Sequence, residues 1–332
     1  MRTAAVLGAG SWGTALAVHL HRTGHDVRLW GRDADLAQSM VVTRMNHAYL
    51  AGIELPPAVH VTSAIDEAVR GATVVVVAVP SHGLRGVVHT ARPYLHTGAT
   101  VVSGTKGLEG ATLFRMSQVI EEEAGAQHPV VVLSGPSFAA EVARMLPTAI
   151  LAASTDEHAA ERIQEEFRAP YFRLYASPDV VGVEIAGAMK NVIAIAAGVV
   201  EGLGLGQNAL AALITRGLAE IGRLVEAAGG RRDTVAGLSG LGDLVLTCTG
   251  SLSRNRNVGI ELASGRSVAE IVAGMKMVAE GIRTTSAAVA LGERYAVELP
   301  IVAQMAAVIE GRSDVRSAVE SLMLRPQRSE TA

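Results

Sequence analysis

The sequence is poor in cysteine and in charge, and each shortage excludes a class of protein. Its single cysteine, Cys248, cannot form an internal disulfide and is typical of a protein kept in a reducing compartment. Charged residues make up 18% of the 332 residues and apolar residues 49%, which is typical of a globular chain and not of a disordered one. A formal net charge of −3 provides no electrostatic attraction for nucleic acid or for an acidic membrane surface.

The sequence also shows no motif of metal ligands and no pattern of a signal peptide. No group of His, Cys and carboxylate residues has the spacing of metal ligands, so no metal site is expected. The chain starts directly with a strand pattern from Met1 to Leu7, which leaves no room for a signal peptide. We therefore expect a cytoplasmic protein, and its length is sufficient for two domains with separate hydrophobic cores.

A glycine motif follows the first predicted strand. The apolar stretch Thr3–Leu7 is followed at once by GAGSWG at residues 8–13 and then by a helical pattern. This is the G-x-G-x-x-G order of dinucleotide-binding sites. Gly8 permits the tight turn, Gly10 lets the backbone approach a pyrophosphate, and Gly13 lets the helix pack on the strand. The motif predicts an NAD(P) site at the beginning of a Rossmann-type sheet.

Further strand patterns extend this sheet. They occur at residues 26–30, 72–79, 99–103, 130–133, 149–154 and 172–175. The run ATVVVVAV at residues 72–79 is apolar without interruption, as in a parallel strand covered on both faces. From residue 180 onward the patterns are helical only. The sequence thus predicts an α/β fold with a doubly wound N-terminal domain over residues 1–178 and an all-helical domain over residues 179–332.

One lysine is out of place in the helical half. Residues 180–200 are apolar on nearly every face, but Glu184, Lys190 and Asn191 near the middle argue against a membrane span. Burial of a lysine requires a partner and lowers its pKa toward the range useful for proton transfer. Glu184 lies on a different helix face, which favours a functional lysine over a structural pair. Asp243 is the obvious partner, although it is also placed to cap the following helix.

Other polar residues lie where a ligand is expected. Lys106 is flanked by glycines at the carboxyl end of a predicted strand, where substrates of such sheets bind, unless it is only a solvated turn lysine. Ser137 follows the next strand at a predicted helix start, and His82 follows another as a weaker candidate. Arg254 and Arg256, interleaved with Ser and Asn, make a plausible phosphate cradle or a polar surface loop.

The motifs taken together resemble one family. They are GAGSWGTALA, VPSH, TKGLE, SGPSFAAEV, GAMKNVIAIAAG, LITRGLAE, GLGDLVLTCT, SRNR and VAEG. In this order they resemble the bacterial NAD(P)-dependent glycerol-3-phosphate dehydrogenases over nearly the whole chain. The resemblance implies that Lys190 is the proton acceptor. It implies substrate contacts from Lys106, Gly135, Ser137, Lys190, Asp243, Ser253, Arg254 and Asn255. It implies cofactor contacts from Ser11, Trp12, Arg32, Lys106, Ala139, Arg254, Val278 and Glu280, beside the three motif glycines.

The implied reaction is a reversible hydride transfer between NAD(P)H and dihydroxyacetone phosphate. Its product, sn-glycerol 3-phosphate, would serve glycerophospholipid synthesis, and the low charge and apolar helical domain permit a homodimer. Two alternatives remain open. One is a β-hydroxyacid or sugar-acid dehydrogenase with the same two domains, and the other is an NADPH sensor without catalysis.

The choice of coenzyme depends on the tip of the second predicted strand. Gly31-Arg32-Asp33 has no acid immediately at the tip to bind a ribose 2′-hydroxyl, and Arg32 can pair with a 2′-phosphate. We therefore predict that Arg32→Ala weakens NADPH binding more than NADH binding. Titration of the variant with both coenzymes tests this, and equal losses would show that Arg32 is only a solvated surface residue.

Overall fold

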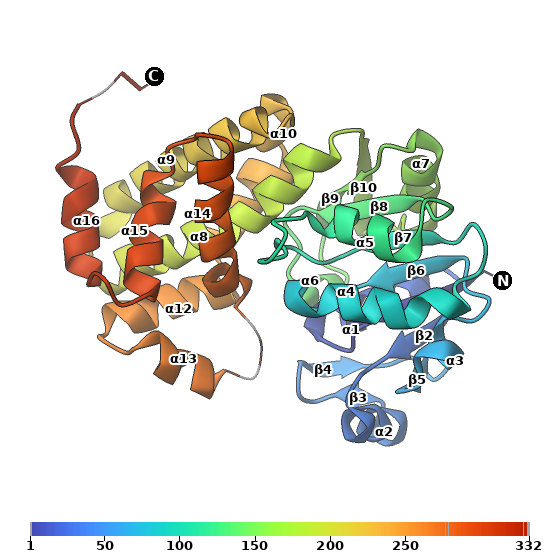
Figure 1. Ribbon diagram of the computed structural model, residues 1–332. Coiled ribbons are helices and arrows are strands. Elements are labelled where there is room, and N and C mark those ends of the chain that lie inside the picture. Colours follow the sequence, from blue (N-terminus) through green and yellow to red (C-terminus); the bar gives the residue numbers. More distant parts are fainter. Residues whose placement is uncertain (1, 276, 278, 328, 331–332) are drawn as a thin grey trace.

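The computed structural model describes residues 2–275, 277, 279–327 and 329–330, and these form two parts that lie side by side (Figure 1). The N-terminal part is a sheet with helices on both faces. The C-terminal domain consists of helices, and no described residue after position 177 belongs to a strand. The fold class predicted from the sequence is therefore confirmed.

The sheet has eight strands in the order β10-β9-β8-β7-β6-β1-β2-β5. Their bounds are β1 Thr3–Leu7, β2 Asp26–Trp30, β5 His60–Thr62, β6 Val74–Val77, β7 Thr100–Ser103, β8 Val130–Ser134, β9 Thr148–Ala153 and β10 Phe172–Ser177. All neighbours pair in parallel except β8 and β9, which are antiparallel. All four valines of β6 are buried, as expected for a strand covered on both faces.

Helices from the connections cover both faces of the sheet. They are α1 Ser11–Arg22, α2 Ala34–Thr43, α3 Ile65–Val69, α4 Ser81–Ala91, α5 Met116–Ala124, α6 Ala139–Ala143 and α7 Glu157–Glu166, with the 3₁₀ turn η1 Arg92–Tyr94. Because the strands β1, β6, β7 and β8 are parallel, their carboxyl ends share one edge, where the predicted ligand residues follow them.

Sequence patterns missed the short elements and misplaced one helix start. The hairpin of β3 (Met45–Asn46) and β4 (Leu50–Glu54) lies in a region whose sequence was uninformative, as does β5. β3 and β5 have two and three residues, and the five residues of β4 include a glycine in the middle, so none of them shows the apolar run of the predicted strands. The helix expected after β8 begins only at Ala139, so Pro136 lies in the preceding turn and not in the first helical turn.

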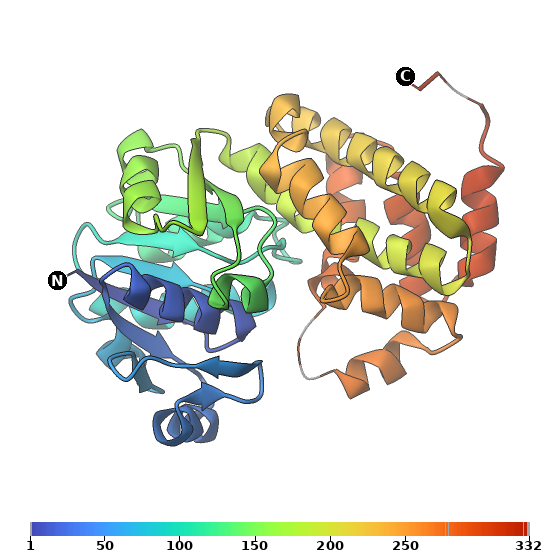
Figure 2. The same cartoon turned by 180° about the vertical axis from the view of Figure 1, so that it is seen from behind.

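The helical domain is built around α8 (Val180–Gly202), which Figure 2 shows running from the sheet into the middle of the other helices. Those helices are α9 Gly206–Ala227, α10 Arg232–Val235, the π-helical turn η2 Leu238–Gly242, α11 Asp243–Thr249, α12 Arg254–Ala263, α13 Val268–Gly274, α14 Glu280–Arg294, α15 Pro300–Ile309 and α16 Val315–Met323. By length and composition α8 is apolar enough to cross a membrane, but 94% of its most apolar window is buried inside the protein. It is the core helix of this domain.

The junction between the two parts is short and highly bonded. β10 ends at Ser177, and Asp179 caps α8 by accepting a hydrogen bond from the Gly182 amide at 2.9 Å. The other carboxylate oxygen of Asp179 accepts from the Arg231 amide at 2.9 Å and from the Thr234 hydroxyl at 2.6 Å. One buried carboxylate thus ties the start of α8 to the segment that begins α10.

Two glycines let α8 and α12 cross at close range. A Cβ on Gly259 of α12 would overlap the carbonyl oxygen of Ile195, and a Cβ on Gly198 of α8 would overlap that of Arg256. Both obstacles are backbone atoms inside helices, which cannot turn aside as a flexible side chain would.

We predict that Gly259→Ala lowers the free energy of unfolding by more than about 2 kcal/mol, because the overpacking outweighs a helix-propensity gain of about 1 kcal/mol. The matched control is Gly222→Ala in α9, where a Cβ would have no described atom within 4 Å. Urea denaturation should show a neutral or stabilising effect for the control. Equal stability of the two variants would show that the helices separate at little cost.

Candidate active site

Lys190, Asp243 and Lys106 meet where the helical domain faces the carboxyl edge of the sheet. The Lys190 ammonium donates hydrogen bonds to Asp243 Oδ1 at 2.8 Å and to Thr247 Oγ1 at 2.7 Å. The Lys106 ammonium donates to Asp243 Oδ2 at 2.6 Å and to the Gly135 carbonyl oxygen at 3.0 Å. The predicted pairing of Lys190 with Asp243 is confirmed, and the structure adds Lys106 as a second partner of the same carboxylate.

Burial and charge set the protonation of this cluster. Burial lowers the pKa of Lys190 to about 8, with the Lys106 charge acting in the same direction and the Asp243 carboxylate against it. Burial alone would raise the pKa of Asp243, but the ammonium groups of Lys106 and Lys190 hold it below its usual value. Asp243 therefore remains ionised, while Lys190 is poised to gain or lose a proton near neutral pH.

The local sequence explains how Asp243 comes to point inward. Asp243 is the first residue of α11 and follows directly on the π-helical turn η2. Within that turn a Cβ on Gly240 would overlap the Val235 carbonyl, so only glycine lets the segment pack this closely. The Asp243 carboxylate accepts from the two lysines, and the α11 cap has no side-chain hydrogen bond, so the capping alternative is not realised.

The loops after β7 and β8 contribute the substrate side of the nucleotide-binding part. Lys106 extends from the loop after β7, and its Gly135 partner follows β8 with a φ of 139°, a conformation that favours glycine. The Ser137 hydroxyl donates to the same Gly135 carbonyl at 3.0 Å. The structure thereby brings together Lys106, Gly135 and Ser137, three of the expected substrate residues.

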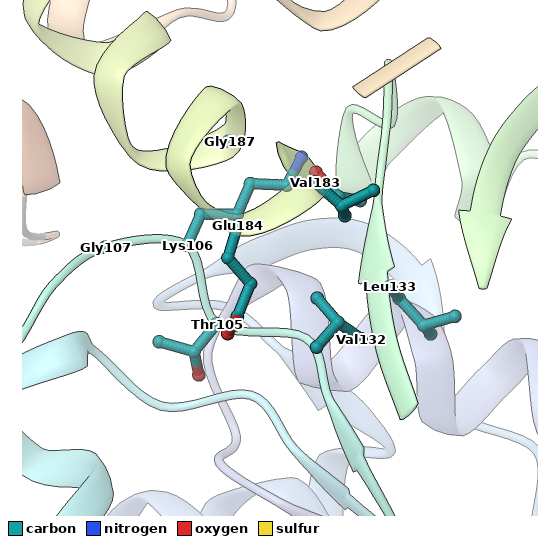
Figure 3. Close-up of a pocket in the computed structure, with 9 residues that line it drawn as sticks. Thr105, Lys106, Gly107, Val132, Leu133, Val183, Glu184 and Gly187 are labelled. Carbon is teal, nitrogen blue, oxygen red and sulfur yellow. The ribbon is translucent and has the colours of Figure 1, made fainter. Parts of the chain in front are cut away.

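A small pocket lies between these loops and α8. Figure 3 shows Thr105, Lys106 and Gly107 on one side of it and Glu184 and Gly187 of α8 on the other. β8 contributes Val132, Leu133 and Ser134 to its wall.

The glycine motif has the geometry of a dinucleotide cradle. Gly8 has a φ of 120°, and a Cβ there would collide with the Ala78 backbone. A Cβ on Gly13 would overlap the Gly8 carbonyl, whereas one on Gly10 would have no described atom within 4 Å. The loop is therefore tightly packed around Gly8 and Gly13 and has free space at Gly10. Gly10 lies at the N-terminus of α1, where backbone amides favour an anion.

The remaining predicted cofactor residues of the sheet lie around this motif. Ser11 begins α1, and Trp12 and Ala139 pack partly buried against the same hydrophobic core. Arg32 is exposed just beyond β2, beside Asp33, whose carboxylate caps α2 by accepting from two amides at 3.0 and 3.1 Å. That carboxylate is engaged by its own helix, as the coenzyme hypothesis requires, and the role of Arg32 stays a prediction.

The SRNR segment forms the start of α12. Ser253 is the N-cap and Arg254 the exposed first residue of this helix. Asn255 is buried, and its amide donates to Asn191 Oδ1 at 2.9 Å and accepts from the Gly281 amide at 2.9 Å. Asn255 therefore joins α8, α12 and α14, and its predicted contact with substrate would use the remaining N–H of its amide group.

Glu280 spans the two parts of the molecule. Its carboxylate accepts from the Ser81 amide at 3.1 Å and the Ser81 hydroxyl at 2.7 Å, at the N-terminus of α4. The expected cofactor contact of Glu280 is thus placed beside the sheet edge. Val278, the other cofactor residue predicted in this segment, lies outside the described residues.

Sequence reasoning missed two participants. Thr247, one turn after Asp243, accepts from Lys190 and donates to the Asp243 carbonyl at 2.6 Å. The i,i+4 spacing within α11 was the available signal. Glu184 pairs with Arg115 at 2.6 Å and not with Lys190, and its partner is 69 residues distant in the chain, beyond the reach of any local pattern.

A dinucleotide cradle that faces a buried, carboxylate-paired lysine across two domains defines an NAD(P)-linked dehydrogenase. The comparisons narrow this class. Residues 3–160 match the model of the NAD-dependent glycerol-3-phosphate dehydrogenase N-terminus and residues 179–320 that of the C-terminus. The chain belongs to the glycerol-3-phosphate dehydrogenase family.

Relatives and a solved structure agree along the full length. The glycerol-3-phosphate dehydrogenase [NAD(P)+] of Koribacter versatilis is 50% identical, with 99% of each chain covered. That of Nitratidesulfovibrio vulgaris is 50% identical over 98% of this chain and 99% of its own. The crystal structure of glycerol-3-phosphate dehydrogenase from Coxiella burnetii is 40% identical, covers 98% of this chain and 99% of its own, and superposes with a TM-score of 0.94.

We predict that Asp243→Asn lowers the free energy of unfolding at pH 7 by about 3–5 kcal/mol, because two buried ammonium groups lose their shared counter-charge. The loss should be smaller at pH 9.5. Above its pKa of about 8, Lys190 is already neutral in the parent protein, so its attraction to Asp243 no longer contributes. Urea denaturation at both pH values measures this. A loss that is constant with pH would show that Lys190 does not change its charge between pH 7 and pH 9.5.

Proposed function

We propose that this protein catalyses the reversible, NAD(P)H-dependent reduction of dihydroxyacetone phosphate to sn-glycerol 3-phosphate. The observation that carries the proposal is the buried Lys190–Asp243–Lys106 cluster at the carboxyl edge of a dinucleotide-binding sheet. The names of the 50%-identical relatives support the same reaction. A role in glycerophospholipid synthesis follows from the product.

The glycine motif fits a dinucleotide, since it is tightly packed around Gly8 and Gly13 and leaves free space at Gly10. When bound, the nicotinamide supplies or accepts the hydride. Ser11, Trp12, Arg32, Ala139 and Glu280 would hold this cofactor from around the motif, with Lys106 and Arg254 on the substrate side. Val278 remains a predicted cofactor residue from the sequence.

Lys190 exchanges the proton in this proposal. In the reduction its ammonium donates a proton to the C2 oxygen as that oxygen gains charge, and in the reverse direction the neutral amine accepts it. Because burial lowers the pKa of Lys190 to about 8, reduction should be favoured below that pH and oxidation above it.

Asp243 and Thr247 orient the Lys190 amine, since each engages it within 2.8 Å. Lys106 stabilises the negative charge that develops on the substrate oxygen, and its bond to the Gly135 carbonyl holds it at the sheet edge. The hydrogen bonds among these groups fix their positions, so little reorganisation is needed during the reaction.

Substrate recognition would use the first turn of α12. Arg254 is a forked cation at the N-terminus of a helix, a combination that suits a phosphate group. Ser253 and Asn255 flank it in the sequence, and Gly135 and Ser137 would contact the substrate beside Lys106. Specificity for a phosphorylated substrate follows from this placement.

The proposal also covers the domain boundary, the oligomeric state and the cellular location of the chain. We place the domain boundary between residues 178 and 179, where β10 ends and Asp179 caps α8. The chain would act as a cytoplasmic homodimer, and light scattering after gel filtration would measure its mass. A monomeric mass would leave the reaction mechanism unaffected, because every residue assigned to it belongs to one chain.

We predict rapid NADPH oxidation with dihydroxyacetone phosphate and little with unphosphorylated dihydroxyacetone. Lys190→Ala should abolish this turnover while the variant still binds NADPH, because it removes the group that exchanges the proton and, among the described residues, only Lys106 remains as an ammonium on Asp243. Absorbance at the nicotinamide band and a thermal-shift titration measure the two properties. Turnover retained by Lys190→Ala would reject the mechanism, and equal rates with and without the phosphate would reject the substrate.

A further inference from the structure

Glu184 is a buried carboxylate that the proposed mechanism does not use. It lies on α8, six residues before Lys190, and its side chain is only 3% exposed. We propose that Glu184 is a positioning residue, which fixes the helix that carries Lys190 against the nucleotide-binding part. This inference rests on the proposed function, because it concerns the same transfer between a bound nicotinamide and a substrate at Lys190.

All the bonds of Glu184 go to one segment of the nucleotide-binding part. Oε1 accepts from the Ser117 amide at 2.8 Å. Oε2 accepts from the Ser117 hydroxyl at 2.5 Å and from Arg115 Nη1 at 2.6 Å. Arg115 also donates to the Ser117 hydroxyl at 2.9 Å, so the three residues form a closed network.

The network lies at the N-terminus of α5. Arg115 is the residue before this helix and Ser117 is its second residue. The Glu184 carboxylate therefore accepts a hydrogen bond from one of the amides that a helix leaves without an intrahelical partner. Burial raises the pKa of Glu184, against the opposing effects of Arg115 and Ser117. A carboxylate this deeply buried is stable only while its partners stay in place, which makes the docking position of α8 specific.

The position of α8 determines where Lys190 lies relative to a nicotinamide at the sheet edge. Six residues of helix separate Glu184 from Lys190 by about 9 Å along the axis. Figure 3 shows Glu184 and Lys106 in the wall of the same pocket, one from α8 and the other from the loop after β7. A slip of α8 at Glu184 would therefore displace Lys190 from the group to which it transfers a proton, and a displacement of about 1 Å can cost about 100-fold in rate.

Glu184 acts through position and not through charge. The charges that act most on the pKa of Lys190 are those of Asp243 and Lys106, and the Glu184 carboxylate is paired with Arg115. Loss of Glu184 should therefore slow the reaction without moving the pH at which Lys190 titrates. A charge effect would move that pH.

The chain offers a matched control in Glu220. This second buried carboxylate also caps a helix, accepting from the Ile301 amide at 2.8 Å and the Val302 amide at 3.4 Å at the start of α15. Its pKa is likewise raised by burial, to about 7. All these contacts lie within the helical domain, so Glu220 shares the chemistry of Glu184 but does not connect the two parts.

The test compares Glu184→Gln with Glu220→Gln in the intact protein. Dihydroxyacetone phosphate reduction by the parent protein is measured first, and its absence would reject the proposed function and not the role of Glu184. For Glu184→Gln we expect kcat to fall by at least about tenfold, while the Kd for NADPH and the midpoint of the pH profile stay unchanged. With NADPH deuterated at the transferred hydrogen, the isotope effect on kcat should increase, because hydride transfer becomes the slower step.

Glu220→Gln should lose stability but keep kcat within about twofold of the parent value. Parent-like kcat in a folded Glu184→Gln would overturn the proposal, and so would a shifted pH midpoint or an equal loss of kcat in the control. If Glu184→Gln does not fold, Ser117→Ala replaces it. That variant removes the two hydrogen bonds of the Ser117 hydroxyl but keeps the amide and Arg115 bonds of Glu184. It should show the same pattern with a smaller loss, whereas unchanged kcat and isotope effect would overturn the proposal.

Discussion

The structure depends on one carboxylate shared by two ammonium groups. Asp243 is 1% exposed and remains ionised because Lys106 and Lys190 hold it from opposite oxygens. The Asp243 carboxylate in turn offsets the repulsion between the two ammonium groups, because it lies between them. Since Lys106 belongs to the sheet edge and the other two to the helical domain, the cluster exists only when both parts are assembled. Docking and proton transfer therefore use the same contacts.

Four other carboxylates, of which Glu184, Glu220 and Asp179 are buried and Glu280 is partly buried, follow a related rule. Glu184 accepts from the N-terminus of α5, Glu280 from that of α4, Glu220 from that of α15, and Asp179 from that of α8. In the first three cases the carboxylate comes from a distant part of the chain. Helix N-termini that face the interior are thus satisfied by long-range partners, and two of these partners, Glu184 and Glu280, join the sheet to the helices. The polar groups that are costly to bury lie where the orientation of the parts matters.

The architecture was predictable because its signals are local and repeated. Apolar runs with glycine turns located seven of the eight strands of the large sheet, and an all-apolar helix with one lysine located Lys190. The pairing of Lys190 with Asp243 followed from the cost of burying either alone. The strands β3 to β5 and the Arg115–Glu184 pair were not predictable, because those strands lack an unbroken apolar run and distant pairs leave no spacing to detect. The ion pair of Lys106 with Asp243 was missed for the same reason, since it depends on how the two domains dock.

The short connection between β10 and α8 at Asp179 limits which insertions the protein can accommodate. Only Pro178 separates the edge strand β10 from the capping residue of α8. The Asp179 amide donates to the Ser177 hydroxyl at 3.2 Å, and its carboxylate accepts from the Gly182 and Arg231 amides of the helical domain. The chain has no slack at this point that could absorb a shift of the edge strand. An insertion between Ser177 and Asp179 would rotate and translate the whole of α8, although it would touch neither ligand nor core. The junction is therefore a place where loop length, and not residue chemistry, is under constraint.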